Sequence, residues 1–194
     1  LDLHENDFLY VEKGGEIIPK IVGVELSQRD IFASKIEFIT NCPECNTPLI
    51  RKEEEAGTFC PNDQSCPPQI KGKLEHFISR KAMNIDSLGE GKIEVLFSNG
   101  LVRNIADFYD LSYDQLIGLE KKVINENDLT ERVISFQNKT VQNILNGIEK
   151  SKEVPFERVL FAIGIRFVGE TTAKKLALQF KNIHELCNAS YEEL

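Results

Sequence analysis

The sequence lacks the long apolar runs and the excess of positive charge that mark two large classes of proteins. No apolar run approaches the roughly 20 residues that a membrane-spanning helix needs, so we expect no contact with a membrane. No basic stretch followed by an apolar one opens the chain, as it would in a secretory signal peptide. The formal net charge is −8, which is unlike the basic surface typical of nucleic-acid-binding proteins.

Paired catalytic groups are absent as well. His4, His76 and His184 stand alone in the sequence, and each is better explained as a surface or hydrogen-bonded residue than as the partner of a nucleophile. No residue of this chain is therefore predicted to be catalytic. The informative features are instead a segment rich in cysteine and proline, and two segments in which glycine precedes a helix.

Four of the five cysteines lie in residues 41–69, NCPECNTPLIRKEEEAGTFCPNDQSCPPQ. Cys42 and Cys45 form a C-x2-C pair, 14 residues separate Cys45 from Cys60, and five more separate Cys60 from Cys66. Tetrahedral zinc binds four thiolates at about 2.3 Å, and a tight turn after each first cysteine supplies two of them. The spacing predicts a closed, structural zinc site. A disulfide set or free thiols are the alternative, although disulfides are typical of secreted chains.

The residues before the cysteines predict β structure. Residues 7–24, DFLYVEKGGEIIPKIVGV, indicate a strand, a turn at the glycine pair and a second strand, and residues 35–39 are compatible with another short strand. Two or three strands cannot close a barrel, so we interpret this piece as the end of a β domain. From Gln69 onward the apolar pattern is helical and is punctuated by glycines.

Two segments of the helical part share an apolar-x-x-apolar-Gly pattern followed directly by a helix: residues 83–96, MNIDSLGEGKIEVL, and residues 160–177, LFAIGIRFVGETTAKKLA. Free N–H groups of such a turn and of the next helix form a small cup that suits a phosphate, whatever the DNA sequence. The alternative is an ordinary helical hairpin with a glycine cap. The candidate DNA-binding residues are Gly89, Gly91, Lys92, Gly164, Arg166, Gly169, Thr171, Lys174 and Lys175.

A third candidate between these segments lacks their glycines. Residues 133–145, VISFQNKTVQNIL, keep the apolar positions and the helix, and the polar residues 120–132 before them are interpreted as a loop-like insertion. We therefore do not assign phosphate binding to this segment, and whether it contacts DNA is left open. Around the other two segments, residues 69–92 and 155–181 each carry five basic residues against two or three acidic ones. We therefore expect modest DNA affinity with a strong salt dependence.

The order of these segments resembles the carboxy-terminal half of a bacterial NAD-dependent DNA ligase. The resemblance rests on VEKGGEIIPKIVGVE, CPECNTPL…CPNDQSCPPQ, AMNIDSLGEGKIEVL and LFAIGIRFVGETTAKKLA, and it covers nearly the whole chain. It implies a multi-domain fold with the end of an oligonucleotide-binding (OB-fold) barrel over 1–39. A small zinc finger would follow over 40–68, and a truncated, all-α helix-hairpin-helix domain over 69–194.

The resemblance also implies ligands for these residues. Cys42, Cys45, Cys60 and Cys66 would bind structural zinc. The hairpins at Gly89–Gly91 and Gly164–Gly169 would approach the minor-groove side of nicked duplex DNA. The remaining domains of a longer chain would be further partners.

Nick sealing in DNA replication and repair is the activity that the resemblance implies for the parent protein. A lysine would take AMP from NAD and pass it to the 5′-phosphate at a nick. The 3′-hydroxyl would then attack this phosphate and displace the AMP. The full-length enzyme would use NAD and magnesium in the bacterial cytoplasm. The family's lysine lies in a Lys-x-Asp-Gly motif, but this chain has no Asp-Gly dipeptide, so we expect it to be inactive alone.

Two other classes of protein remain open. Non-catalytic recombination scaffolds also combine a zinc site with helix-hairpin-helix units, but in them the hairpin precedes the zinc site. A protein-docking module with purely structural glycine turns would explain the acidic net charge. The absence of DNA affinity at low salt would identify such a docking module.

Overall fold

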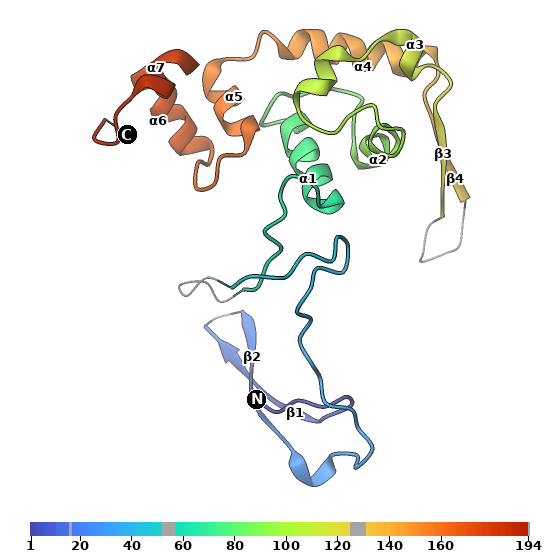
Figure 1. Cartoon of the computed structure of the whole chain (residues 1–194), viewed down its shortest axis with the longest axis vertical. Coiled ribbons are helices and arrows are strands. Elements are labelled where there is room, and N and C mark those ends of the chain that lie inside the picture. Colours follow the sequence, from blue (N-terminus) through green and yellow to red (C-terminus); the bar gives the residue numbers. More distant parts are fainter. Residues whose placement is uncertain (16, 52–56, 125–130, 194) are drawn as a thin grey trace. The chain divides into compact units, whose positions relative to one another are not determined.

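The computed structural model describes residues 1–15, 17–51, 57–124 and 131–193 (Figure 1). The chain divides into two compact units, unit 1 over Leu1–Pro61 and unit 2 over Asn62–Leu194. No helix within these described ranges is long and apolar enough to cross a membrane.

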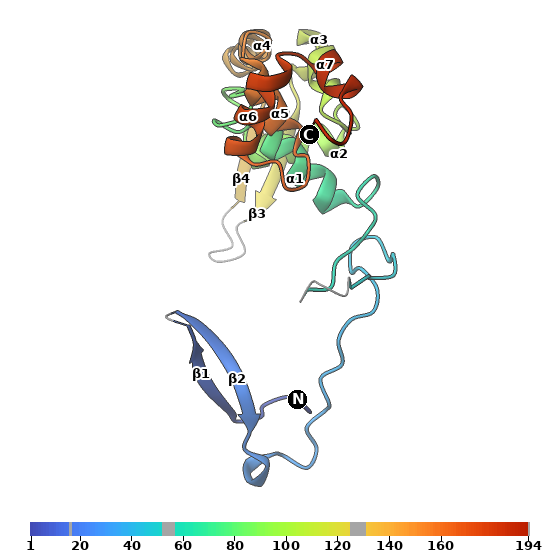
Figure 2. The same ribbon diagram turned by 90° about the vertical axis from the view of Figure 1, so that its left-hand side faces the viewer.

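Unit 1 contains a two-stranded antiparallel ribbon, as the sequence predicts. Strand β1 (Leu9–Gly14) pairs with β2 (Ile18–Val24), as Figure 2 shows. The register shifts between Tyr10 and Val11. A short 3-10 helix, η1 (Leu26–Gln28), follows β2. The expected strand at 35–39 was wrong, because Lys35 forms only an isolated bridge with His4 and residues 36–39 have no strand pairing.

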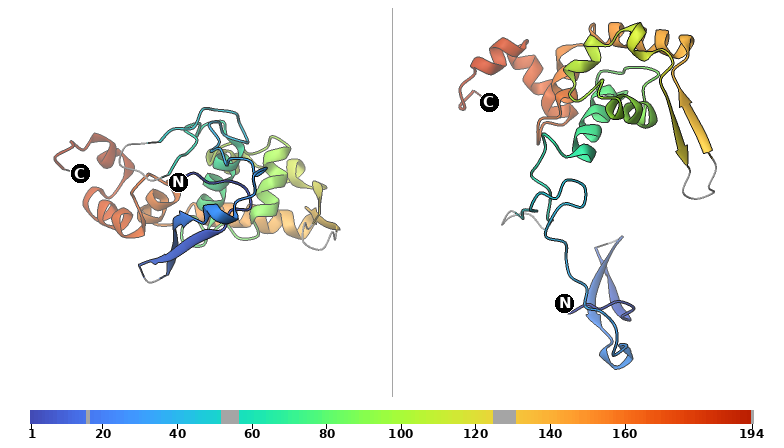
Figure 3. Two further views of the ribbon diagram at one scale, coloured as in Figure 1. Left: turned by 90° about the horizontal axis from the view of Figure 1, so that it is seen from below. Right: turned by 45° about the vertical axis from the view of Figure 1, so that its right-hand side comes forward.

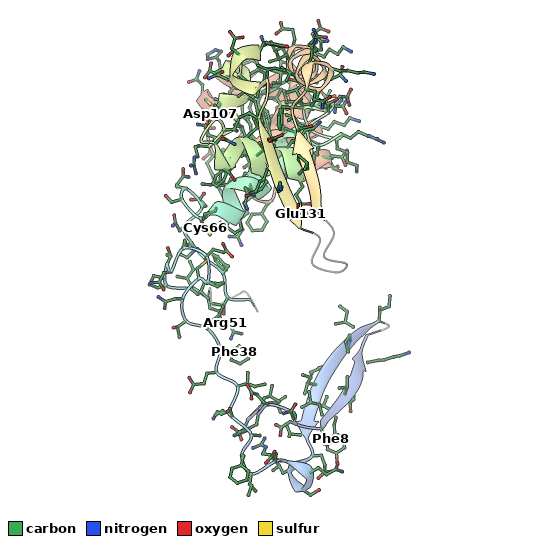
Figure 4. All side chains as sticks on the ribbon, turned by 90° about the vertical axis from the view of Figure 1, so that its right-hand side faces the viewer. Phe8, Phe38, Arg51, Cys66, Asp107 and Glu131 are labelled. Atoms are coloured by element: carbon green, nitrogen blue, oxygen red, sulfur yellow. The ribbon has the colours of Figure 1, made fainter. Side chains whose placement is uncertain are left out.

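The described part of unit 1 contains ion pairs but no apolar core. The Arg29 guanidinium bonds the Asp7 carboxylate at 2.9 Å and the Asp2 carboxylate at 2.8 Å, which ties the segment after β2 to the start of the chain. Within the described part of unit 1, no aliphatic or aromatic side chain is buried, and Phe8 and Phe38 point into solvent (Figure 4). This strand pair therefore has an apolar surface without a covering layer.

Unit 2 is mainly helical. Proline at the first two positions of its first helix suits the helix start, where no intrahelical N–H partner is needed. The elements in chain order are α1 (Pro67–Ile78), α2 (Glu90–Ser98), η2 (Ala106–Asp110), α3 (Tyr113–Leu116), β3 (Glu120–Ile124), β4 (Glu131–Ser135), α4 (Asn138–Ser151), α5 (Phe156–Ile163), α6 (Glu170–Phe180) and α7 (Ile183–Asn188).

One apolar core lies among α1, α2, α4 and the segment between α2 and α3. Helix α4 presents Val141, Ile144 and Ile148 to this core at helical spacing, and each is buried. At Gly147 of the same helix, a Cβ would lie 3.0 Å from the backbone nitrogen of Asp86. Glycine at this position therefore allows α4 to pass close to the turn between α1 and α2.

The polar residues 120–132 are not simply a loop. Strands β3 and β4 form an antiparallel pair with Glu120 opposite Ser135, and residues 125–130 lie outside the described part (Figure 3). Unit 2 therefore also contains a small sheet, which the expected all-α description omits. The sequence did not reveal these strands because an exposed two-stranded ribbon needs little of the alternating apolar pattern that identifies a strand.

The β3–β4 ribbon docks against α2. The Glu94 carboxylate of α2 binds Lys121 of β3 at 2.9 Å and Lys71 of α1 at 2.7 Å. A Cβ at Gly91 would lie 2.5 Å from the Cδ1 atom of Ile134 in β4, so glycine permits this close packing. Gly91 thus has a structural role that the sequence pattern did not indicate.

Candidate zinc centre and nucleic-acid interface

The four clustered cysteines come together as the spacing predicts. The sulfur atoms of Cys42, Cys45, Cys60 and Cys66 all lie within 4.8 Å of one another. Those of Cys45 and Cys60 are 3.5 Å apart, which is far beyond a disulfide bond of about 2.05 Å. Tetrahedral bonds of about 2.3 Å to zinc would place the sulfurs about 3.8 Å apart, so the donor set fits this metal.

A tight turn presents the first cysteine pair. The Cys42 N–H donates to the Thr47 carbonyl, the Asn46 N–H donates to the Cys42 carbonyl, both at 2.9 Å, and Asn46 has a φ of 57°. Hydrogen bonds of the Cys45 sulfur with the hydroxyl and the backbone of Thr47 lower the pKa of this thiol to about 6, with smaller contributions from Cys60 and Cys42. The turn therefore favours the thiolate form that zinc binds.

The last cysteine connects the cluster to the helical fold. Cys66 is 2% exposed, its N–H donates to the Asn62 carbonyl at 3.1 Å, and it is the N-cap residue of α1. Four sulfur donors leave no open position for a substrate, which is the arrangement of a structural zinc site. Zinc bound here would stabilise the fold and take no part in a reaction.

The two predicted hairpins share a backbone conformation. One joins α1 to α2 and the other joins α5 to α6, and corresponding residues are 80 positions apart in the chain. Asn84 and Ser87 have φ of 52° and 64°, and their counterparts Gly164 and Phe167 have φ of 73° and 69°. The left-handed positions of each turn are therefore not Gly89 or Gly169, which the sequence pattern had singled out.

Gly89 and Gly169 instead begin the second helix of each hairpin. Their φ values of −158° and −81° are open to any residue, and a Cβ at either would meet nothing within 4 Å. Serine, threonine, aspartate or asparagine at an N-cap position would hydrogen-bond to the first N–H groups of the helix. Neither helix has such a side-chain cap, so no side chain of this kind competes for the first N–H groups. At the start of α2, the Lys92 N–H donates to the Gly89 carbonyl at 2.9 Å.

Side chains around the first hairpin are unfavourable for an anion. Its surface groove is lined by Glu75, Asp86 and Glu90, with Arg80 as the basic residue. Burial and the charge of Glu90 raise the pKa of Glu75. This acidic lining differs from the locally basic character that the sequence suggested.

Lys92, one of the predicted DNA-binding cations, faces into the first hairpin. Its Nζ atom donates to the Ser87 carbonyl at 2.5 Å, and the side chain is half-buried. Burial lowers the pKa of this amine. The bond gives Lys92 a role in holding the turn, whereas its contact with DNA stays a prediction.

The hairpin between α5 and α6 lies beside a groove lined by more cations than acids. The basic residues lining this groove are Arg80, Lys81, Arg158 and Lys174, and the acidic ones are Glu157 and Glu170. Lys81 and Glu170 form an exposed ion pair at 2.7 Å. Of the predicted DNA-binding residues, Thr171 also lines this groove.

Most of the predicted DNA-binding residues are exposed on this α5–α6 hairpin. The sequence pattern did not assign Arg80, Lys81 or Arg158 to the site, because Arg158 lies 77 residues from Lys81. Arg158 donates to the Ala82 carbonyl at 2.7 Å and also to the Arg80 carbonyl. Gly89 of the first hairpin is exposed too, and the exposed predicted residues of the α5–α6 hairpin are Gly164, Arg166, Gly169, Thr171, Lys174 and Lys175.

The glycine-free candidate at 133–145 has no comparable turn. Strand β4 ends at Ser135, Phe136 is 1% exposed in the core, and Gln137 is the N-cap residue of α4. The Phe136 N–H donates to the Leu119 carbonyl at 2.8 Å, which continues the ribbon toward the helix. A strand thus occupies the place of the glycine turn.

A four-cysteine site followed by helix pairs with short, tight turns defines a zinc finger next to helix-hairpin-helix units. Comparison with family models agrees with this class. Residues 41–67 match the NAD-dependent DNA ligase C4 zinc finger domain, and residues 158–194 match the helix-hairpin-helix motif.

The relatives that align with the whole of this chain are named DNA ligase. The chain is 55% identical to a DNA ligase of Bacteroides fragilis, 54% to one of Phocaeicola vulgatus and 56% to one of Cytophaga hutchinsonii, each over 194 residues. These alignments cover 100% of this chain and 27% of each relative. The similarity agrees with the resemblance to NAD-dependent DNA ligases, and the chain spans about a quarter of the length of the curated relatives that it matches.

Proposed function

We propose that this chain is the part of an NAD-dependent DNA ligase that grips nicked duplex DNA in replication and repair. Residues 1–39 would be the end of an OB-fold barrel, residues 40–68 the zinc finger and residues 69–194 the DNA-binding domain. The adenylation chemistry, NAD and magnesium would belong to other domains of the bacterial, cytoplasmic enzyme. The missing Asp-Gly dipeptide supports this division, because the catalytic lysine motif requires it.

The start of α6 is the observation that carries this proposal. Gly169 leaves the first N–H groups of the helix without a side-chain cap. The groove beside it contains Lys81, Arg158 and Lys174, and its cations outnumber the carboxylates of Glu157 and Glu170 even though Glu170 pairs with Lys81. The positive end of the helix dipole and these cations together favour a phosphate. Because backbone N–H groups would hold that phosphate, binding would not depend on base sequence.

Binding of the zinc-loaded chain to labelled DNA tests the proposal directly. Nicked duplex, intact duplex and single strand of equal length are compared at about 50 and 200 mM salt. We expect a preference for duplex, with an affinity that falls steeply as salt rises, because each neutralised phosphate releases counterions. No binding to any of the three at low salt would overturn the DNA-gripping role and favour a protein-docking module.

A further inference from the structure

The residue at the tip of the α5–α6 turn is unusual for its position. The Val168 N–H donates to the Ile165 carbonyl at 2.9 Å, and Phe167, at the third position of this turn, has a φ of 69°. Glycine and asparagine are preferred there, because a Cβ makes this conformation costly. The phenylalanine side chain is also 86% exposed, so its ring is not part of the apolar core.

Phe167 lies at the end of the α5–α6 turn, next to charged side chains. The guanidinium carbon of Arg166 lies 4.9 Å from the centre of the Phe167 ring, a cation–π arrangement between neighbouring residues. Gly169, with the uncapped start of α6, follows two residues later, and Thr171 and Lys174 of that helix line the basic groove. An exposed aromatic ring thus stands beside the place where we propose that a phosphate binds.

The first hairpin shows that the fold does not require an aromatic ring here. Ser87 occupies the corresponding position with a φ of 64°, and its carbonyl accepts the Lys92 amine. A small polar residue therefore supports the same turn. The ring of Phe167 must then be explained by something outside the turn.

We propose that the Phe167 ring contacts DNA by packing against deoxyribose carbons in the minor groove, next to the phosphate held at the start of α6. This inference rests on the proposed DNA-gripping function. Apolar side chains that enter the minor groove are a recurrent way of binding DNA without reading its sequence. Arg166 is adjacent to the ring and would face the neighbouring phosphate.

Salt dependence distinguishes this contact from those of the cations. A ring packed on sugar carbons releases no counterions, so its loss should weaken binding equally at every salt concentration. Loss of a lysine that contacts a phosphate should instead reduce the slope of log affinity against log salt. The two types of contact therefore have different signatures in one titration.

The test compares Phe167→Gly, Phe167→Leu and wild type on a nicked 30-base-pair duplex over a salt series. We expect Phe167→Gly to bind about five- to twentyfold more weakly with an unchanged salt slope, and Phe167→Leu to lie between the two. Glycine relieves the positive φ, so thermal stability should not fall. Leu178→Ala, which removes another exposed apolar side chain of the same hairpin, is the control and should bind as wild type.

Fluorescence supplies a second readout. The chain has no tryptophan, so Phe167→Trp introduces a single reporter. On addition of nicked duplex we expect its emission to be quenched and its access to iodide to fall.

Two outcomes would overturn the Phe167 contact while leaving the DNA-gripping function intact: wild-type affinity in Phe167→Gly, or a bound complex in which the tryptophan signal does not change. A wild-type chain that binds no DNA would overturn both.

Discussion

The two glycine hairpins have the same backbone but different side chains. The Asn84–Gly89 and Gly164–Gly169 turns share their left-handed positions and the glycine that starts the next helix. Five residues after that glycine, the first hairpin has Glu94 and the second has Lys174. Glu94 binds two lysines within unit 2, whereas Lys174 lines an exposed basic groove.

This difference indicates that the backbone conformation of a hairpin does not by itself determine whether the hairpin can bind a phosphate. Both turns offer N–H groups at a helix start, and each helix has a glutamate in its first turn, Glu90 or Glu170. Around the first turn the carboxylates outnumber the cations, whereas around the second the cations outnumber the carboxylates. Carboxylates near a phosphate oppose its binding, while lysine and arginine favour it. We therefore expect the α5–α6 hairpin to provide most of the affinity for DNA and the α1–α2 hairpin to serve the fold.

Removal of zinc should have the largest effect on the stability of the fold, and it should affect the first hairpin more than the second. Structural zinc contributes on the order of 10 kcal/mol in zinc-finger peptides, and Cys66 begins α1, the first helix of the first hairpin. With a strong chelator we expect hydrogen exchange to rise at the cysteine turns and in α1, with little change in α6. Protons compete for the thiolates, so lowering the pH should release the metal in the same way.

An equal rise of hydrogen exchange in α1 and α6 would contradict this separation. Returning zinc should restore protection, which excludes irreversible damage as the cause.

Gly169→Asp should weaken DNA binding at least tenfold at about 0.1 M salt. The new carboxylate would cap the first N–H groups of α6 and repel a phosphate. Gly89→Asp is the matched variant and should change affinity by less than about threefold, because the first hairpin is already acidic. Fluorescence anisotropy with nicked duplex measures both.

Thermal unfolding controls this pair of variants. A Cβ meets open space at both positions, so neither variant should be less stable than wild type. Equal losses of affinity in the two variants would mean that the hairpins bind DNA alike.

Glu94→Gln should lower the stability of unit 2 by about 1 kcal/mol, because the carboxylate bonds Lys71 and Lys121 on neighbouring elements. Hydrogen bonds from Lys71 and then Lys121 lower the pKa of Glu94 from 4.5 to about 2. A lowered pKa gives stability that is present above pH 4.5 and is lost as the pH falls toward 2.

Urea unfolding of both proteins at several pH values measures this difference, and zinc release at low pH affects the two alike. The gap between wild type and variant should close as the pH falls. A gap that stays constant down to pH 2 would show that charge on Glu94 is not its source. DNA affinity at neutral pH should change by less than about twofold, since Glu94 serves the fold.

Lys174→Met should have the smallest effect, an affinity about threefold lower with a salt slope reduced by about one phosphate contact. Lys92→Met, the matched change in the first hairpin, should leave the slope unchanged, because the Lys92 amine is bonded to the Ser87 carbonyl. A slope that falls in Lys92→Met as much as in Lys174→Met would show that both hairpins meet phosphates.

The zinc site could be predicted almost completely from sequence, whereas the proposed DNA interface could not. Cysteine spacing encodes the local turns, and the Cys42–Thr47 turn forms through hydrogen bonds between near neighbours. The basic groove instead joins Arg158 to Lys81 across 77 residues, and no local pattern records that approach. The β3–β4 ribbon escaped prediction because its strands lack a clear apolar alternation, and its contacts with Gly91 and Glu94 of α2 join segments far apart in the chain.

The sequence by itself determined the four-cysteine cluster, the β1–β2 ribbon and the two helix starts at Gly89 and Gly169, because each depends on residues close together in the chain. Only the tertiary structure decided which of the two helix starts is surrounded by positive charge that favours a bound phosphate. It directs Lys92 inward, gives Glu94 two lysine partners and gathers Lys81, Arg158 and Lys174 around one groove. Electrostatic interaction falls with distance in space rather than along the chain, so two similar sequence patterns acquire different surroundings once the helices pack.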